Sequence, residues 1–158
     1  MRKKKEMISM RRSCECGWEM KTRFLINADD YGQNCDVTNA ILECFRSQWI
    51  SQTTMLVNYD YAQEAVERAK TEGVSDRVGL HLNFTMGQPL TKAIKQFREI
   101  CDADGSFWQH NFGNGLFPLK GSIAAAIRDE ARAQIERYCS FDLSLMHCDG
   151  HHHVHNRL

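Results

Sequence analysis

The chain has 158 residues, which is enough for one domain with a sizeable buried core. Its 20 basic and 20 acidic residues balance, so the composition gives no indication of a nucleic-acid partner. No apolar run approaches the length that crosses a bilayer, and the basic residues 2–5 are not followed by the apolar segment of a signal peptide. We therefore expect a cytoplasmic protein without a membrane partner.

The first nineteen residues differ from the rest of the chain. They are basic, contain the doublet Cys14 and Cys16, and show little hydrophobic periodicity. We predict a disordered basic leader over residues 1–19 and one domain over residues 20–158; a metal-binding CxC arm is the weaker alternative, because no partner ligands lie nearby. The seven cysteines are scattered and include no CxxC pair, which argues against a disulfide framework and favours a reducing compartment.

The domain begins with a strand followed by a helix. Apolar residues 24–28 predict the strand, and apolar residues at helical spacing predict a helix over residues 36–45. A second strand is expected over residues 53–58. Asp60 is placed to cap a second helix that extends to about residue 70, with Gln63 placed for the reciprocal capping contact.

The alternation continues towards the C-terminus. A third strand is expected over residues 77–83, and a long irregular stretch follows it. A helix is predicted over residues 122–138 and a fourth strand over residues 143–148. One face of that helix is expected to carry the apolar residues Ile123, Ile127, Ala131 and Ile135.

Strands separated by helices indicate βαβ units and a parallel sheet, because parallel neighbours need crossover connections. We therefore expect an α/β fold. In such folds sites form where the strands end, and unusual polar residues occur there in this chain. They are Asp29 and Asp30 after the first strand, Asn58 after the second, His81 and Asn83 on the third, and a histidine run after the fourth.

The histidine run holds five of the seven histidines of the chain within residues 147–155. Imidazole is the commonest protein ligand for divalent transition metals, so this density indicates a metal site. An expression tag is the weaker reading, because Val154 interrupts the run and an apolar segment precedes it. In a strand His151, His153 and His155 would share one face and His152 the other, so we expect some of them to be structural.

Asp29 and Asp30 suit metal-assisted hydrolysis, since one carboxylate can bind a cation while its neighbour takes a proton from water. The pair before Gly32 also fits a simple helix-entry turn. Strand alternation places His81 on the same face as Asn83 and Thr85, with apolar residues opposite. We interpret His81 as a ligand rather than as a core histidine.

Four segments resemble the YdjC family of carbohydrate deacetylases, which includes the chito-oligosaccharide deacetylases. They are residues 26–32 (INADDYG), 53–58 (TTMLVN), 78–85 (VGLHLNFT) and 147–155 (HCDGHHHVH). The resemblance implies a (β/α) barrel-like fold. It also implies a hydrolase that removes acetyl groups from N-acetylglucosamine units of short chitin oligomers, with a small-molecule carbohydrate as substrate.

By position, the resemblance implies that Asp30, His81 and His151 bind a divalent metal ion and that Asp29 is the general base. The cofactor expected is zinc or magnesium; two histidines and one carboxylate suit zinc, whereas magnesium prefers more oxygen ligands. Four further residues are candidates to support the ligands or to contact substrate: Asn83, His147, His153 and His155. The residue that protonates the leaving amine stays open among the histidines.

The chain departs from the family pattern in one respect. Family members continue beyond the HHHVH segment, this chain ends three residues after it, and a full (β/α) barrel takes roughly 250 residues. We expect an incomplete barrel with exposed strand edges and apolar faces, which favours self-association such as a homodimer. The alternatives are a truncated relative that binds metal and catalyses little, and an amidohydrolase or phosphoesterase built on an HxH pair such as His151 and His153.

Overall fold

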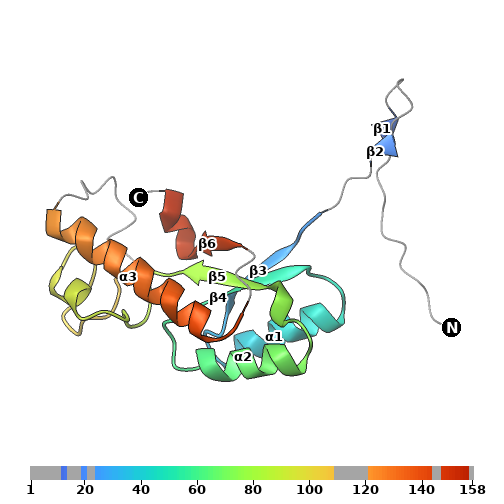
Figure 1. Ribbon diagram of the computed structural model, residues 1–158, viewed down its shortest axis with the longest axis horizontal. Helices are drawn as coiled ribbons and strands as arrows, with labels where there is room; N and C mark the ends of the chain where they lie inside the picture. The colour runs from blue at the N-terminus through green and yellow to red at the C-terminus, as the bar shows by residue number, and fades with distance from the viewer. Residues whose placement is uncertain (1–11, 14–18, 21–23, 109–120, 144–146, 157–158) are drawn as a thin grey trace.

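The computed structural model describes residues 12–13, 19–20, 24–108, 121–143 and 147–156. Its centre is a four-stranded parallel sheet in the order β3-β4-β5-β6 (Figure 1). The strands are β3 (Asn27–Tyr31), β4 (Gln52–Met55), β5 (Val78–Leu82) and β6 (Cys148–Gly150). A separate antiparallel pair, β1 (Arg12–Ser13) and β2 (Glu19–Met20), falls within and at the end of the predicted leader, whose disorder stays a prediction.

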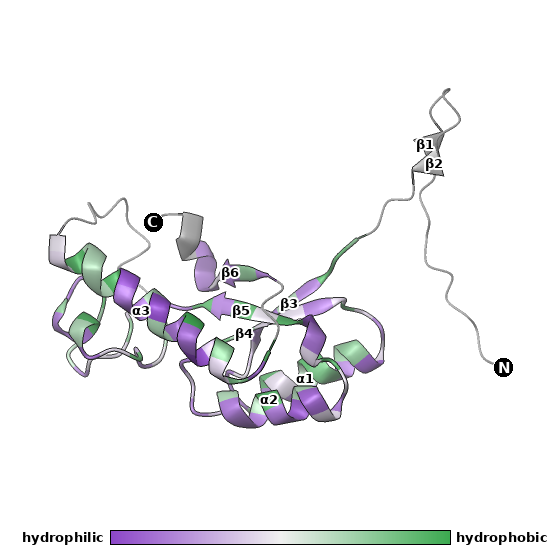
Figure 2. Cartoon of the chain, in the orientation of Figure 1, coloured by the Kyte–Doolittle hydropathy of each residue, from purple (hydrophilic) through white to green (hydrophobic). Residues whose placement is uncertain are grey.

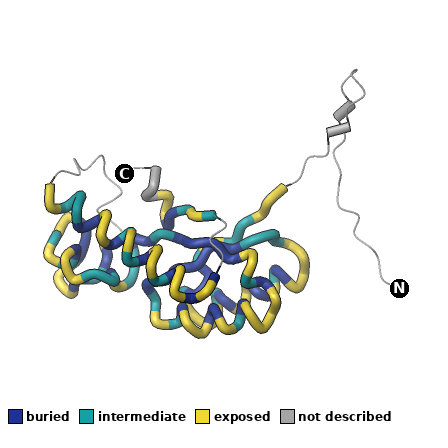
Figure 3. Tube along the Cα trace, in the orientation of Figure 1, coloured by how far each residue is buried: buried dark blue, intermediate teal, exposed yellow. Residues whose placement is uncertain are grey.

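Three α-helices follow the strands: α1 (Cys35–Arg46), α2 (Ala62–Thr71) and α3 (Gly121–Ser140). All three contribute to one apolar core, in which Leu42, Val66 and Tyr138 from the helices meet Val78 and Leu80 of β5. The two inner strands, β4 and β5, are mostly buried (Figure 3). Strand order follows chain order, as in one part of a (β/α) barrel. The predicted α/β class with an incomplete barrel-like parallel sheet is confirmed.

The helix predicted over residues 36–45 is confirmed as α1, and Asn34 caps it. The Asn34 side chain accepts a hydrogen bond of 2.9 Å from the Val37 amide, which satisfies one free amide of the first turn. The capping predicted for the next helix is wrong. The N-cap of α2 is Tyr61, which makes no side-chain capping bond, and Gln63 bonds to Glu67 within the helix instead.

The first strand lies further along the chain than predicted. Residues 24–28 were expected to form it, but pairing with β4 begins at Asn27 opposite Gln52. The side chains of Phe24, Leu25 and Ile26 are 73%, 76% and 52% exposed. This exposed segment is the hydrophobic stretch that leads into β3 (Figure 2). β3 is an edge strand, and among the described residues no apolar group covers these three side chains.

The third helix is confirmed, although its predicted buried face is only partly correct. Ile127 is buried, but Ile135 is 39% exposed. The helix instead buries Glu130 and Gln134 completely. Each lies one position before a residue of the predicted apolar face, Ala131 and Ile135. Ile123 and Ala131 are partly buried against the same side, so the prediction fails at Ile135 and misses the two buried polar side chains, which a sequence pattern assigns to solvent.

Glu130 and Gln134 connect α3 to the long segment after β5. Glu130 accepts hydrogen bonds from the amides of Leu90 and Thr91 at 2.9 and 2.7 Å and from the Thr91 hydroxyl at 2.8 Å. Gln134 bonds to both backbone groups of Asn83. A second apolar cluster lies under this segment, formed by Phe84, Ile94, Ile100, Cys101, Phe107, Ala126 and Ile127. The segment is therefore anchored at its start.

The C-terminal end differs from the prediction of a strand over residues 143–148. The strand observed is β6 at Cys148–Gly150, and residues 144–146 lie outside the described part. After β6 the chain forms a 3₁₀ helix at His151–Asn156, in which His152 and His153 have φ values of 52° and 56°. The expectation that these histidines alternate along a strand is therefore wrong. Within the described residues, no helix is long and apolar enough to span a membrane.

Candidate functional site

The carboxyl ends of β3, β5 and β6 bring the candidate site together. β3 contains a register shift between Ala28 and Tyr31, and Asp30 within it has φ 71°, a left-handed conformation that aspartate tolerates. The aspartates therefore lie inside the strand rather than after it as predicted. In a regular strand neighbouring side chains point to opposite faces; here Asp29 and Asp30 both approach His81.

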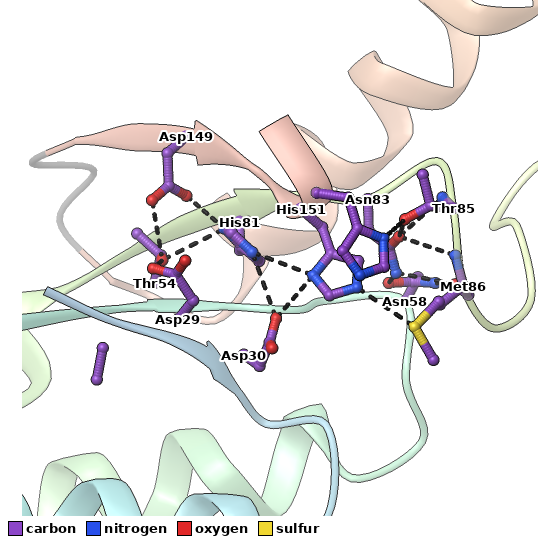
Figure 4. A network of polar contacts seen from close by, with 12 residues as sticks. Asp29, Asp30, Thr54, Asn58, His81, Asn83, Thr85, Met86, Asp149 and His151 are labelled. Carbon is purple, nitrogen blue, oxygen red and sulfur yellow. Dashed lines mark hydrogen bonds and ion pairs between the residues drawn. The ribbon is translucent and has the colours of Figure 1, made fainter. Parts of the chain in front are cut away.

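Asp30, His81 and His151 form a compact triangle (Figure 4). Asp30 Oδ1 lies 2.8 Å from His151 Nδ1 and 3.3 Å from His81 Nε2. His81 Nε2 and His151 Nδ1 are 3.3 Å apart. His81 and His151 are 2% and 5% exposed. The structure thus brings together the three residues predicted to bind a metal ion.

The charges of this triangle depend on one another. Burial raises the pKa of Asp30, but the contacts with His151 and His81 outweigh burial and hold it well below its usual value. Burial lowers the pKa of His81, whereas hydrogen bonds to Asp149 and Asp30 raise it to about 9. The two carboxylates that flank His81 therefore favour its protonated form.

The triangle fits a metal ion. Asp30 Oδ1 is buried and has no hydrogen bond of normal geometry to the described residues, although two imidazole nitrogens lie close to it. Two ligand atoms bound to one tetrahedral zinc lie about 3.4 Å apart. The three separations of 2.8, 3.3 and 3.3 Å are near that value. Two nitrogens and one oxygen that converge in this way would hold a divalent cation.

Asp29 lies beside the triangle. Its side chain is exposed, and its Oδ1 accepts a hydrogen bond of 2.7 Å from Asn27 Nδ2. The buried Thr54 hydroxyl lies 3.5 Å from the same oxygen. An accessible carboxylate held by an amide is suited to take a proton from a reacting water molecule.

Asp149 is a residue that the sequence analysis missed. Its Oδ1 lies 2.5 Å from His81 Nδ1, and its Oδ2 accepts a hydrogen bond of 3.2 Å from Thr54. Burial raises the pKa of Asp149, but the bond to His81 outweighs burial and lowers it. The sequence did offer an indication: Asp149 lies two residues before the predicted ligand His151, so it had to lie near the site. The register with β5 was needed to pair it with His81.

Asn83 does not reach the triangle. Its amide group donates to Asn58 Oδ1 at 3.0 Å and to the Met86 carbonyl at 2.8 Å, and its Oδ1 accepts from the amides of Thr85 and Met86. Asn58 in turn donates to the carbonyls of Met86 and Gln88. The two asparagines therefore shape the turn after β5. Met86 Sδ of that turn lies 3.4 Å from His151 Nε2.

The other histidines occupy different places. His147 Nε2 lies 3.3 Å from Asn27 Oδ1, and its ring fills the space beside Gly79, where any Cβ would lie 2.6 Å from it. His152 is stacked on His151 with ring centroids 3.9 Å apart and contacts the Thr85 hydroxyl at 3.0 Å. His153 is exposed and is not one of the three residues of the triangle. The His155 side chain lies outside the described residues.

These features define a class: a parallel α/β protein with one carboxylate and two imidazoles at the carboxyl ends of its strands. The family model described as YdjC-like protein matches residues 23–158. The chain belongs to this family.

Several relatives are similar over most of this chain. A carbohydrate deacetylase of Vibrio parahaemolyticus is 34% identical over 133 residues, which cover 84% of this chain and 50% of the relative. A carbohydrate deacetylase of Clostridium beijerinckii is 34% identical over 134 residues, covering 85% and 51%. The chain spans about half the length of the curated relatives it matches.

A solved structure shows the same fold. It is from Enterococcus faecalis V583 and is provisionally described as a cellobiose-phosphate cleavage protein. The TM-score is 0.72 at 28% sequence identity, with 85% of this chain and 50% of that chain covered. The parallel sheet of this chain therefore corresponds to about half of a larger fold.

Proposed function

We propose that this chain carries the metal site and general base of a hydrolase that removes acetyl groups from N-acetylglucosamine units of chito-oligosaccharides. The observation that supports the proposal is the convergence of Asp30, His81 and His151 next to the accessible Asp29. The relatives named carbohydrate deacetylases support the substrate class. The cytoplasmic location and the homodimer stay predictions.

Asp30 Oδ1, His81 Nε2 and His151 Nδ1 would hold the cation. Two imidazole nitrogens with one carboxylate suit zinc better than magnesium, which prefers oxygen ligands. A bound divalent cation lowers the pKa of water and stabilises negative charge on a carbonyl oxygen. The chain's own contribution is to hold the three atoms close together from β3, β5 and the start of the 3₁₀ helix after β6.

Asp29 acts as the general base in this proposal. Asn27 fixes its Oδ1, so the carboxylate is held in place to receive a proton from the water that attacks the acetamide carbon. The C–N bond then breaks, acetate forms, and the amine nitrogen must gain a proton. His152, whose ring contacts His151, and His153 are both exposed and are candidates to supply that proton.

The test is acetate release from N,N'-diacetylchitobiose by purified protein with added zinc or magnesium. We expect release by the unchanged protein and its loss in Asp29→Asn, which keeps size and hydrogen bonding but cannot accept the proton. No release despite one bound equivalent of metal would favour the alternative of a metal-binding relative that catalyses little. The HxH alternative loses support here, because His153 is not part of the triangle.

A further inference from the structure

Behind the metal-site histidine lies a carboxylate to which the proposed function assigns no role. Asp149 and His81 are direct partners in the parallel register of β5 and β6. Their side chains meet at 2.5 Å, between Asp149 Oδ1 and His81 Nδ1, while the opposite ring nitrogen of His81 faces Asp30 at 3.3 Å. One buried ring therefore connects a carboxylate outside the triangle to the carboxylate within it (Figure 4).

We propose that Asp149 is the positioning residue that orients His81 for cation binding. Asp149 accepts the Nδ1 hydrogen, which fixes the ring plane and leaves Nε2 as the nitrogen that faces Asp30 and His151. A carboxylate partner also makes the opposite nitrogen a better electron donor. This inference rests on the proposed function, because it takes the triangle as the metal site.

Asp149 is itself held in place. The Thr54 hydroxyl, on a residue with no exposed surface, donates to Asp149 Oδ2 at 3.2 Å. Asn27 Nδ2 donates to Thr54 Oγ1 at 3.0 Å and to Asp29 Oδ1 at 2.7 Å. The same hydrogen-bonded network therefore fixes the orienting carboxylate and the general base. A carboxylate held by Thr54 through one oxygen can impose one ring orientation on His81 through the other.

The second histidine of the triangle is supported differently. The outer nitrogen of His151, Nε2, faces Met86 Sδ at 3.4 Å, and a thioether is only a weak acceptor. His81 is therefore the ligand whose outer nitrogen bonds to a carboxylate. Loss of such an outer partner typically weakens metal binding by about 10-fold to 100-fold.

Asp149 could instead be a ligand of a second cation, since Asp29, His81 Nδ1 and Asp149 also lie within 4.8 Å of one another. The 2.5 Å contact argues against this reading. Two atoms bound to one tetrahedral zinc lie about 3.4 Å apart, and a contact of 2.5 Å departs further from that value than any separation in the triangle. A directly shared hydrogen fits 2.5 Å, and an intervening cation does not.

The test compares metal-free wild-type protein with Asp149→Asn, Asp149→Ala and the control Asp142→Asn. Asp142 is exposed, lies outside the triangle and has φ 57°, which asparagine also tolerates. Zinc affinity is measured by competition with a chromophoric chelator, and the ligand set by the visible spectrum of the cobalt form. Thermal unfolding of each metal-free variant shows whether it folds.

We expect wild type and Asp142→Asn to bind one equivalent equally well. Asparagine keeps an acceptor oxygen but no charge, so Asp149→Asn should bind about 10-fold more weakly, and Asp149→Ala about 100-fold. The cobalt spectrum should keep its form in Asp149→Asn, because the three ligands remain. Such partial rescue by the conservative variant is not expected from a residue that only packs.

Equal zinc affinity of wild type and Asp149→Asn would overturn the inference and leave the proposed metal site standing. Two equivalents in wild type and one in the Asp149 variants would overturn it in favour of a second cation. No binding by folded wild-type protein would remove the proposed metal site and this inference together. Because Asp149→Asn preserves size, the comparison holds even where Asp149→Ala does not fold.

Discussion

At the scale of single residues, histidines that are close together in the sequence lie in different environments. His151 turns its Nδ1 to within 2.8 Å of Asp30, while His153, two positions later, is exposed and outside the triangle. The left-handed backbone at His152 and His153 causes the difference, because the chain leaves the strand direction immediately after β6. Which histidine approaches Asp30 therefore depends on backbone conformation rather than on residue type.

This difference gives a prediction for His81→Ala and His153→Ala. The first variant removes a ligand of the triangle and leaves Asp30 and Asp149 without their shared imidazole, so zinc affinity should fall by more than about 100-fold. The second should weaken binding far less. Both are measured by chelator competition on metal-free protein; the reverse order of effects would refute the ligand assignment and favour the HxH alternative.

At the scale of elements, the segment after β5 is held by buried polar side chains of α3. Glu130 is fully buried and accepts three hydrogen bonds from Leu90 and Thr91 and one of 3.0 Å from Gln134. Gln134 and Asn83 continue this network towards the turn that carries Met86. The position of the turn near His151 therefore depends on a helix that contributes no residue to the triangle.

Replacing Glu130 by glutamine should lower the free energy of unfolding by about 1–3 kcal/mol. Glutamine replaces one acceptor oxygen by an NH2 group, which is itself a donor. If the NH2 group takes the place of Oε2, the amide and the hydroxyl of Thr91 lose their acceptor. Urea denaturation measures the change, with Glu136→Gln as control, because Glu136 is an exposed carboxylate on the same helix. If both variants are equally stable, Glu130 does not anchor this segment.

The elements also show what a sequence can predict. The helix α1 was predictable because Asn34 and the apolar spacing after it are local signals. The burial of Glu130 and the pairing of Asp149 with His81 were not predictable. Glu130 bonds to a residue 40 positions away, and Asp149 pairs with a residue 68 positions away. The three residues of the triangle were predicted by resemblance to a family; the structure brings them together and adds the carboxylate beside His81, while their role as ligands stays a prediction.

At the scale of the whole molecule, the sheet has two ends, β3 and β6, and the strands follow one another in chain order. The matched part of this chain spans about half the length of its curated relatives. The triangle nevertheless uses only β3, β5 and the 3₁₀ helix that directly follows β6, so all three of its residues lie in the described part of the chain. Metal binding by this chain can therefore be tested separately from substrate binding.

The end of the sheet at β3 should promote self-association. Phe24, Leu25 and Ile26 are more than half exposed and continue directly into an end strand, a combination that exposes both apolar surface and unpaired backbone groups. The double variant Phe24→Ser, Leu25→Ser should shift the molar mass in solution towards that of the monomer, measured by size-exclusion chromatography with light scattering. Ile135→Ser, which changes an exposed apolar residue on α3, is the control and should leave the mass unchanged. An unchanged mass in the double variant would show that this segment does not drive association.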